Sequence, residues 1–333
     1  WINGLNQMDL IIVPSEHAAR VFKTVSFDKV DNKTKQIVER TSCKRPIEIL
    51  FEGLDDDIYK RTREIPKTIH DKLNEIPENF NYLFVGHWLS GAPGHDRKDV
   101  HTLIKIFCES FRNKHTKPGL ILKTSGATFS IVDRDEILQK IRKVRDAIGP
   151  TAPNVYLLHG DLEPTEMNGL YNHPKVKVHV SFTKGEGFGR PLLEASATGK
   201  PVIATNFSGH IDFLKHSILL PGELKQVHKS AVWDKVLIKE SQWFYVNEKY
   251  ASKVLKDVFK HYKKYQIAAK KQAAFTVKNF SLDLMREKFK EMLEKYIPPT
   301  VAEVKLTLPK LKMSGPSTPT VSEIKLPKLK KIE

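Results

Sequence analysis

Short apolar runs alternate with helical patterns along most of the chain. The apolar runs are rich in β-branched residues and are bounded by glycine, proline or polar residues, which is typical of buried strands. They are DLIIVP (9–14), IEILF (47–51), YLFVG (82–86), GLILKT (119–124), NVYLL (154–158), VKVHVS (176–181) and PVIAT (201–205). Residues 98–111 and 134–148 place apolar side chains three and four positions apart, which predicts helices. We therefore expect an α/β protein whose parallel sheet is covered on both faces.

This alternation breaks in a polar stretch, residues 56–80, which contains Pro66 and Pro77. We interpret residues 61–80 as a hinge or linker. Residues 1–60 then form the last βαβ part of an N-terminal Rossmann-like domain. Residues 81–298 form a complete C-terminal Rossmann-like domain with a doubly wound parallel sheet, and from residue 240 onward its pattern predicts helices only. Because the chain begins inside a strand and helix pattern, we expect an N-terminal truncation.

The pattern changes again after Pro298 and Pro299. A Lys/Leu/Pro phrase occurs twice, as VAEVKLTLPKLK (301–312) and VSEIKLPKLK (321–330), around the spacer MSGPSTPT. Such a composition cannot build a core, so we predict a disordered tail over residues 299–333. Two alternatives remain open for it, a peptide ligand for a partner protein and contact with an anionic surface.

Composition narrows the class of protein. No apolar run approaches the roughly 20 residues of a membrane-spanning helix, and no secretory signal opens the chain. The two cysteines, Cys43 and Cys108, are too few for a disulfide framework, which favours a cytoplasmic location. The formal charge of +16 favours acidic partners. A nucleic acid is disfavoured because no basic patch is interleaved with aromatic residues. Peripheral contact with an anionic membrane stays open.

The candidate chemistry lies in residues 176–205, which read as strand, loop, helix and strand. The loop after Ser181 contains three glycines within GEGFG (185–189), and Pro191 opens the helix, where its missing N–H does no harm. Ligands of open α/β sheets bind at the carboxyl ends of strands, and free N–H groups at a helix start can bind phosphate. The spacing differs from the dinucleotide fingerprint GxGxxG, so the glycines alone indicate little.

Two acids add information to this loop. Glu186 lies before the helix and Glu194 on its second turn, so the two can flank one ligand. Carboxylates accept hydrogen bonds from vicinal hydroxyls, which sugars and riboses present. Phosphate at the glycines and hydroxyls at the acids together describe a nucleotide sugar. As alternatives, Glu186 caps the helix, and Glu194 is an exposed acid paired with Arg190.

These residues resemble a known family. GEGFGRPLLEASATGKPVIAT (185–205) resembles the Glu-x7-Glu signature of retaining GT-B glycosyltransferases, the family 4-like group called glycosyl transferases group 1. IIVPSEHAARVF and IEILFEGLDDD resemble the end of that family's acceptor-side N-terminal domain and its hinge. YLFVGHWLSGAPGHDRKDVHTLIKIF resembles the first βα unit of its nucleotide-sugar-binding domain, and NVYLLHGDL the strand and turn beside its base pocket. The resemblance covers roughly residues 1–297.

The resemblance implies a role for each candidate. Glu186 would hold the hydroxyls of the transferred sugar, Glu194 the ribose, and Lys98 would face the diphosphate. Backbone N–H groups of residues 187–189 would reach the sugar and phosphate. The catalytic candidates are Glu186, Lys98 and Arg97, and the donor-binding candidates are Gly187, Phe188, Gly189, Glu194, Gly86, His87, Thr183, His159, Gly160 and Arg190.

One argument for Lys98 is independent of the resemblance. Lys98 stands with His95 and Arg97 at a predicted helix start, where cations are disfavoured unless an anion lies nearby. The alternative is a solvated surface lysine.

The sequence also departs from the family pattern. His87 occupies a place where the family commonly has arginine, which weakens one diphosphate contact or leaves it to Arg97. Arg190 stands where an apolar residue is common, and it either reaches phosphate or is solvated. Thr183 replaces a serine. SGHID (208–212) leaves the role of Asp212 open, and His159 is equally well a turn histidine.

The implied activity is transfer of a sugar from a UDP- or GDP-sugar to a glycan, lipid-linked or protein acceptor that stays unidentified. By resemblance, the anomeric configuration is retained and neither a metal ion nor a cofactor is needed. Lys98 and Arg97 would stabilise the departing diphosphate. The alternatives are a nucleotide-sugar epimerase and a non-catalytic nucleotide-sugar-binding or scaffold protein of the same fold. We expect the active site to be incomplete here, since the family's acceptor pocket lies in its N-terminal domain.

Overall fold

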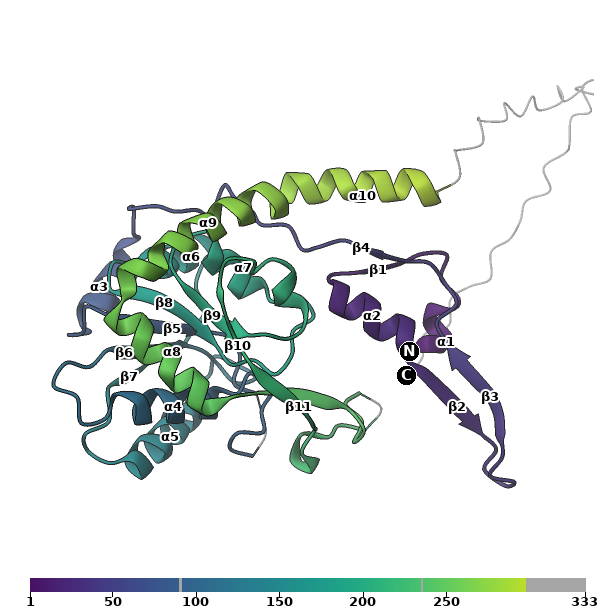
Figure 1. Cartoon of the computed structure of the whole chain (residues 1–333), viewed down its shortest axis with the longest axis horizontal. Helices are drawn as coiled ribbons and strands as arrows, with labels where there is room; N and C mark the ends of the chain where they lie inside the picture. Colours follow the sequence, from purple (N-terminus) through teal and green to yellow (C-terminus); the bar gives the residue numbers. More distant parts are fainter. Residues whose placement is uncertain (90–91, 235, 298–333) are drawn as a thin grey trace, which may run out of the picture. The chain divides into compact units, whose positions relative to one another are not determined.

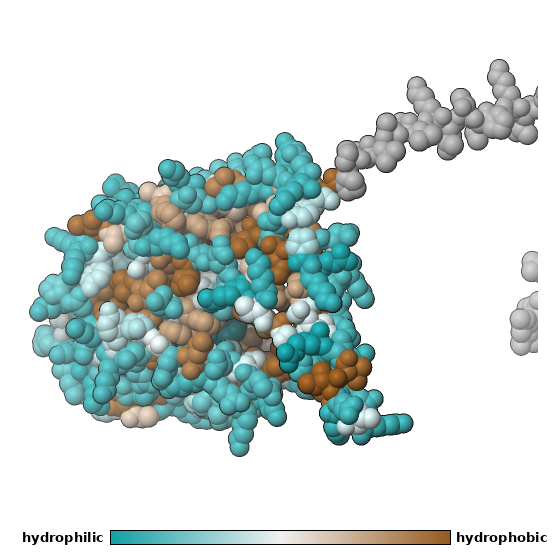
Figure 2. Space-filling model, turned by 45° about the vertical axis from the view of Figure 1, so that its right-hand side comes forward, coloured by the Kyte–Doolittle hydropathy of each residue, from teal (hydrophilic) through white to brown (hydrophobic). Residues whose placement is uncertain are grey.

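A computed structural model describes residues 1–89, 92–234 and 236–297 (Figure 1). The predicted tail over residues 299–333 lies outside these residues. None of the helices in the described ranges combines the length and apolar character that crossing a membrane requires. On the face seen in Figure 2, hydrophilic residues predominate, and hydrophobic residues reach the surface in several separate areas.

The first fifty residues contain the predicted βαβ unit. Strands β1 (Ile11–Val13) and β4 (Ile47–Ile49) pair in parallel, and helix α2 (Glu16–Thr24) follows β1. The Ser15 hydroxyl begins α2 by accepting a hydrogen bond from the Ala18 N–H at 3.1 Å. A short helix α1 (Ile2–Leu5) precedes this unit, and an antiparallel hairpin of β2 (Ser26–Val30) and β3 (Ile37–Ser42) is inserted before β4. The sequence pattern missed the hairpin because its strands are mostly polar and exposed.

A six-stranded parallel sheet forms the centre of the larger part of the chain, in the order β10-β9-β8-β5-β6-β7. Its strands are β5 (Asn81–Val85), β6 (Gly119–Lys123), β7 (Val155–Leu158), β8 (Val176–Ser181), β9 (Val202–Thr205) and β10 (Ile218–Leu220). The first strand of this sheet in chain order is β5. The chain then continues to β6 and β7 on one side of β5 and returns to β8 on the other side. This is the doubly wound arrangement that the sequence predicts, and its switch point lies between β5 and β8.

Helices cover both faces of this sheet (Figure 1). They are α3 (Lys67–Asn74), α4 (Val100–Phe111), α5 (Ile131–Ile148), α6 (Pro164–Asn172), α7 (Arg190–Ser196), α8 (Glu248–Lys260) and α9 (Tyr262–Phe280). Helix α10 (Leu282–Tyr296) follows α9 and extends beyond the sheet (Figure 1). Alternate residues of β5 divide between two hydrophobic clusters. Tyr82 and Phe84 pack with Phe107 of α4, whereas Leu83 packs with Ile69 of α3 and Leu193 of α7. Cys108 is buried in the first of these clusters, which makes it part of the core.

Two segments differ from the sequence pattern. Residues 240–298 are not helices only, because β12 (Gln242–Val246) pairs antiparallel with β11 (Gly222–Gln226). The strand QWFYV has only five residues and no alternation of buried and exposed side chains, so it could not be distinguished from the helices that follow. Within residues 61–80, α3 packs Ile69 and Leu73 into the core, although the sequence pattern indicates no helix there. Two 3₁₀ turns complete the elements, η1 (Gly209–Asp212) and η2 (Lys229–Ala231).

Candidate functional site

Two loops at the carboxyl edge of the sheet carry most of the candidate residues. They follow β5 and β8, the strands that flank the switch point. The loop after β8 packs directly on the loop after β9, and Gly209 makes this close approach possible. A Cβ at Gly209 would lie 2.9 Å from the Cα of Phe188 and would collide with the Gly187 carbonyl. The Glu186 N–H donates to the Ser208 hydroxyl at 2.8 Å, and the Gly209 N–H donates to the Glu186 carbonyl at 3.1 Å.

Glu186 lies at the centre of the site with its side chain only 9% exposed. Its carboxylate accepts hydrogen bonds from Lys98 Nζ at 2.5 Å, Arg97 Nη1 at 3.0 Å and Thr183 Oγ1 at 2.7 Å. Burial disfavours the charged form, but Lys98 and Arg97 outweigh this effect and hold the pKa of the Glu186 carboxyl below its usual value. Glu186 does not cap α7, because the N-cap residue of that helix is Gly189, which adopts a left-handed φ of 104°. The structure therefore joins four predicted residues in one cluster, in which Glu186, Lys98 and Thr183 are largely buried and Arg97 is 43% exposed.

Lys98 is not a solvated surface lysine. Its side chain is 13% exposed, and burial lowers the pKa of its ammonium although Glu186 opposes this shift. Gly86, directly after β5, lies beside this side chain, and a Cβ there would be in ordinary van der Waals contact with Lys98 Cε at 3.5 Å. The next residue, His87, lies 3.0 Å from the Ser125 hydroxyl through Nδ1. Lys98 thus lies buried between the ends of β5 and β8.

Glu194 is also buried, with 9% of its side chain exposed. Arg190 Nε donates to one of its carboxylate oxygens at 3.0 Å, and the Tyr171 hydroxyl donates to the other at 3.1 Å. Burial raises the pKa of Glu194, although both hydrogen bonds act in the opposite direction. The pairing with Arg190 considered as an alternative is therefore present, but the acid in it is buried and not exposed. Arg190 itself is largely exposed and directs its guanidinium to Glu194.

The glycine loop offers backbone donors. Within the described residues, the N–H groups of Gly187 and Phe188 donate to no carbonyl or side chain. The ring of Phe188 is buried and packs 4.9 Å from that of Phe213, so only its backbone can contact a ligand. Because α7 has only seven residues, the positive charge near this loop comes mainly from Lys98 and Arg97 and less from the helix dipole.

His159 and Gly160 form a separate group at the end of β7. His159 Nε2 lies 3.0 Å from Asp133 Oδ2, and Lys123 Nζ donates to the Gly160 carbonyl at 2.5 Å. No hydrogen bond or ion pair among the described residues joins this group to Glu186 or Glu194. In the part of the chain that is described, no three His, Cys, Asp or Glu side chains are placed to hold a metal ion.

Asp212, whose role the sequence leaves open, points to another element. It accepts the Glu16 N–H at 2.9 Å at the start of α2.

Sequence reasoning missed Lys184, Asp99 and Tyr171. Lys184 stands inside the strand and loop unit that carries the glycines, but nothing in the sequence distinguishes a buried lysine from an exposed one. Tyr171 lies on α6, and Asp99 is the residue directly before α4. Only the tertiary structure brings these two residues to the site.

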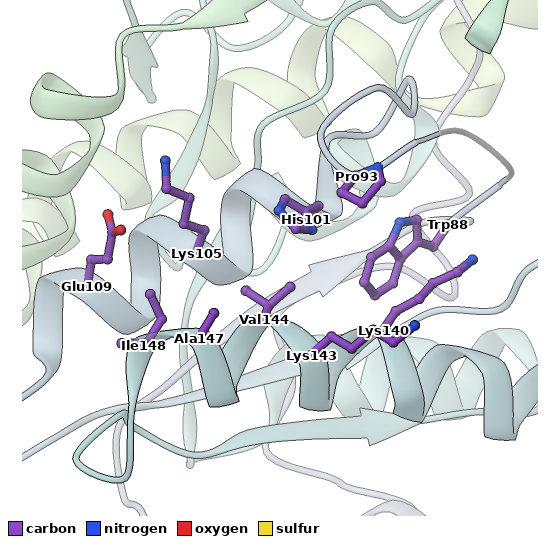
Figure 3. A pocket seen from close by; sticks show the side chains of 10 residues that line it. All are labelled: Trp88, Pro93, His101, Lys105, Glu109, Lys140, Lys143, Val144, Ala147 and Ile148. Atoms are coloured by element: carbon purple, nitrogen blue, oxygen red, sulfur yellow. The ribbon is translucent and has the colours of Figure 1, made fainter.

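A cavity of about 490 Å³ lies elsewhere, between α4 and α5 (Figure 3). It is lined by Trp88, Pro93, His101, Lys105, Glu109, Lys140, Lys143, Val144, Ala147 and Ile148. None of the candidate residues belongs to this set.

The family that the sequence resembles also matches by direct comparison. The model of the family described as glycosyl transferases group 1 matches residues 95–272, more than half of the 333 residues. The chain belongs to this family. The matched range begins at the loop that carries Arg97 and Lys98 and includes Glu186 and Glu194. None of the curated proteins compared with the chain matches it significantly.

Solved glycosyltransferase structures share the fold. Sucrose-phosphate synthase from Thermosynechococcus elongatus is 14% identical with a TM-score of 0.61, over 88% of this chain and 60% of its own. Anabaena HepE, solved with UDP and glucose, is 16% identical with a TM-score of 0.60, over 88% and 65%. A glycosyltransferase from Rickettsia africae is 14% identical with a TM-score of 0.61, over 90% and 67%. The fold is thus of the GT-B type, and the chain spans about 60% of the length of the first of these proteins.

Proposed function

We propose that this protein is a glycosyltransferase that moves a sugar from a UDP- or GDP-sugar to an acceptor hydroxyl with retention of anomeric configuration. One observation carries the proposal. At the switch point of the sheet, the buried carboxylate of Glu186 lies within hydrogen-bond distance of Lys98 and Arg97. An acid for sugar hydroxyls and two cations for a diphosphate therefore lie side by side, as a nucleotide sugar requires.

The rest of the donor fits the neighbouring groups. The N–H groups of Gly187 and Phe188 can donate to phosphate or sugar oxygens, because they have no partner among the described residues. Glu194 would accept the ribose hydroxyls, and Arg190 and Tyr171 hold its carboxylate in place. We assign the base to the side of His159, at the end of β7.

The cations can serve Glu186 and the diphosphate together. A lysine ammonium has three donors and an arginine guanidinium five, so neither is exhausted by its bond to Glu186. As the bond between the anomeric carbon and the diphosphate oxygen breaks, negative charge develops on the diphosphate, and Lys98 and Arg97 would stabilise it. The acceptor oxygen bonds to the anomeric carbon, and its proton leaves to the diphosphate or to water. With this charge supplied by side chains, we propose that the transfer needs no metal ion.

Calorimetric titration of the full chain with UDP-, GDP- and ADP-sugars tests donor binding. We expect one of these donors to bind, and we expect Glu186→Ala and Glu194→Ala to weaken binding. Glu291→Gln, a change of an exposed acid on α10, should leave binding unchanged. The site assignment is wrong if no nucleotide sugar binds, or if neither alanine variant binds more weakly than the wild type.

Turnover is tested separately. Slow hydrolysis of the bound donor should release UDP or GDP equally with and without EDTA, and NMR should show the sugar released first as the anomer present in the donor. Binding without any turnover, even with a panel of acceptors, would instead support the non-catalytic nucleotide-sugar-binding protein.

A further inference from the structure

Lys184, two residues before Glu186, is completely buried. Its Nζ donates to the backbone carbonyls of Gly94 at 2.5 Å and Asp96 at 3.0 Å. It also lies 3.2 Å from the carboxylate of Asp99 and 4.5 Å from the ring centre of Tyr245. All three oxygen partners belong to the segment that carries Arg97 and Lys98. The ammonium is therefore surrounded by the loop that supplies the cations of the candidate site.

The backbone of Lys184 makes two further links. Its N–H donates to the Arg97 carbonyl at 2.8 Å, and its carbonyl accepts the Phe244 N–H at 3.0 Å. Through one residue, the loop after β8 is thus bonded to the segment before α4 and to the hairpin of β11 and β12. Lys184 therefore connects three segments that are far apart in the sequence.

Asp99, the residue after Lys98, has an uncommon backbone conformation. Its φ of 52° and ψ of 39° lie in the left-handed region, which is frequent for glycine and in which aspartate and asparagine occur more often than other residues. The Asp99 carboxylate is held by Lys184 and by the Thr102 hydroxyl at 2.7 Å. Burial raises the pKa of Asp99 to about 6, although Lys184 acts in the opposite direction.

Stability alone is a poor reason for this arrangement. Burying an ion pair costs desolvation of both charges, and apolar residues of similar volume often serve as well. The ion pair of Lys184 and Asp99 instead fixes the position of Asp99, the residue directly after Lys98. We propose that Lys184 is a positioning residue, which holds the segment carrying Arg97 and Lys98 against the loop that carries Glu186. The inference rests on the proposed function, because Lys184 would act on the donor through these residues.

The test compares Lys184→Met with Lys175→Met. Lys175 is a matched control at the opposite end of β8, where its half-buried ammonium donates to the carbonyls of Asn74 and Ile76. Both changes should lower the melting temperature. At a temperature where both variants are folded, Lys184→Met should weaken binding of UDP-glucose or GDP-glucose about tenfold or more, the effect of losing one charge-assisted hydrogen bond. Lys175→Met should stay within about twofold of the wild type. Equal effects of the two changes on binding would overturn the proposal.

A double variant separates positioning from charge compensation. Adding Asp99→Asn to Lys184→Met removes the unpaired buried carboxylate, so thermal stability should rise again. Donor affinity should stay low, because the carbonyls of Gly94 and Asp96 are still not held. Recovery of stability and affinity together would show that Lys184 only neutralises Asp99. If Lys184→Met alone does not fold, the double variant carries the comparison with Lys175→Met.

Hydrogen exchange gives a readout that needs no donor. In Lys184→Met, amides of residues 94–100 and 184–190 should exchange faster than in the wild type, and in Lys175→Met they should not. Unchanged exchange in these two segments would refute the positioning role even if donor binding falls. Conversely, if the wild type binds no nucleotide sugar, the proposed function fails while the exchange measurement still decides whether Lys184 holds the two loops together.

Discussion

Replacing Glu186 by glutamine should separate sugar recognition from diphosphate recognition. The carboxylate accepts bonds from Lys98 and Arg97, and in the donor complex it would also accept the sugar hydroxyls. A hydrogen bond to a charged group contributes about 1.5–3 kcal/mol. Glu186→Gln should therefore weaken UDP-glucose binding roughly 10- to 150-fold if one such bond is lost. UDP alone has no sugar to lose, and Lys98 and Arg97 are no longer partly neutralised. The affinity of the variant for UDP should therefore stay equal to that of the wild type or increase.

The measured quantity is the ratio of the Kd of UDP-glucose to that of UDP, obtained by calorimetry on folded protein. This ratio should rise at least about tenfold in Glu186→Gln and stay at the wild-type value in Glu291→Gln. A thermal melt shows whether the variant is folded at the temperature of the titration. If the two ligands weaken by the same factor, Glu186 acts through the shape of the loop, and the assignment of its carboxylate to the sugar is refuted.

Three further predictions concern residues around this site and the whole chain. Burial lowers the pKa of His179 to about 3, so the stability present above pH 6.5 is lost as the pH falls; at pH 5 the loss is about 2 kcal/mol. His179→Leu should remove this part of the slope in urea unfolding at pH 5 and 7.5, and an unchanged slope would contradict it. Gly209→Ala should push the Gly187 carbonyl away and weaken donor binding at least about tenfold, whereas Gly4→Ala, with no atom near its new Cβ, should not. More of the full chain than of a version lacking residues 300–333 should sediment with liposomes that contain anionic lipid. Equal sedimentation of the two would refute the hypothesis that the tail contacts a membrane.

Five of the six strands of the sheet could be predicted from the sequence, because strands buried on both faces are continuous apolar runs. The sixth, the three-residue edge strand β10 (Ile218–Leu220), was not predicted. All seven predicted strands are present, from β1 to β9 apart from the inserted hairpin. That hairpin has mostly exposed polar strands, and β12 is short and adjoins a helix, so neither had a distinct pattern. A periodic pattern of apolar residues shows which face of a helix or strand is buried. An element that buries few side chains has no such pattern and cannot be predicted in this way.

The candidate site divides in the same way. Glu186 could be singled out because an acid between glycines is chemically conspicuous, and Lys98 because cations at a helix start are unfavourable. Lys184 and Asp99 could not, since their burial depends on residues 94–99 and on β12 folding over the loop after β8. From sequence alone a charged residue is predicted to be exposed, because charged residues are seldom buried without a partner and the partner is known only from the tertiary structure.

The charges of the assembled site explain why an acid can take part in binding an anionic donor. Asp99 neutralises Lys184 within the core, so these two leave no net charge toward a ligand. The cluster of Arg97, Lys98 and Glu186 then has one positive charge in excess. An approaching diphosphate repels the Glu186 carboxylate and favours its protonation, which would remove an acceptor for sugar hydroxyls. Because Lys98 and Arg97 hold the pKa of Glu186 low beforehand, the acid would stay ionised while the same cations bind the diphosphate of the proposed donor. The site therefore needs both cations close to the acid, which is the arrangement that Lys184 maintains.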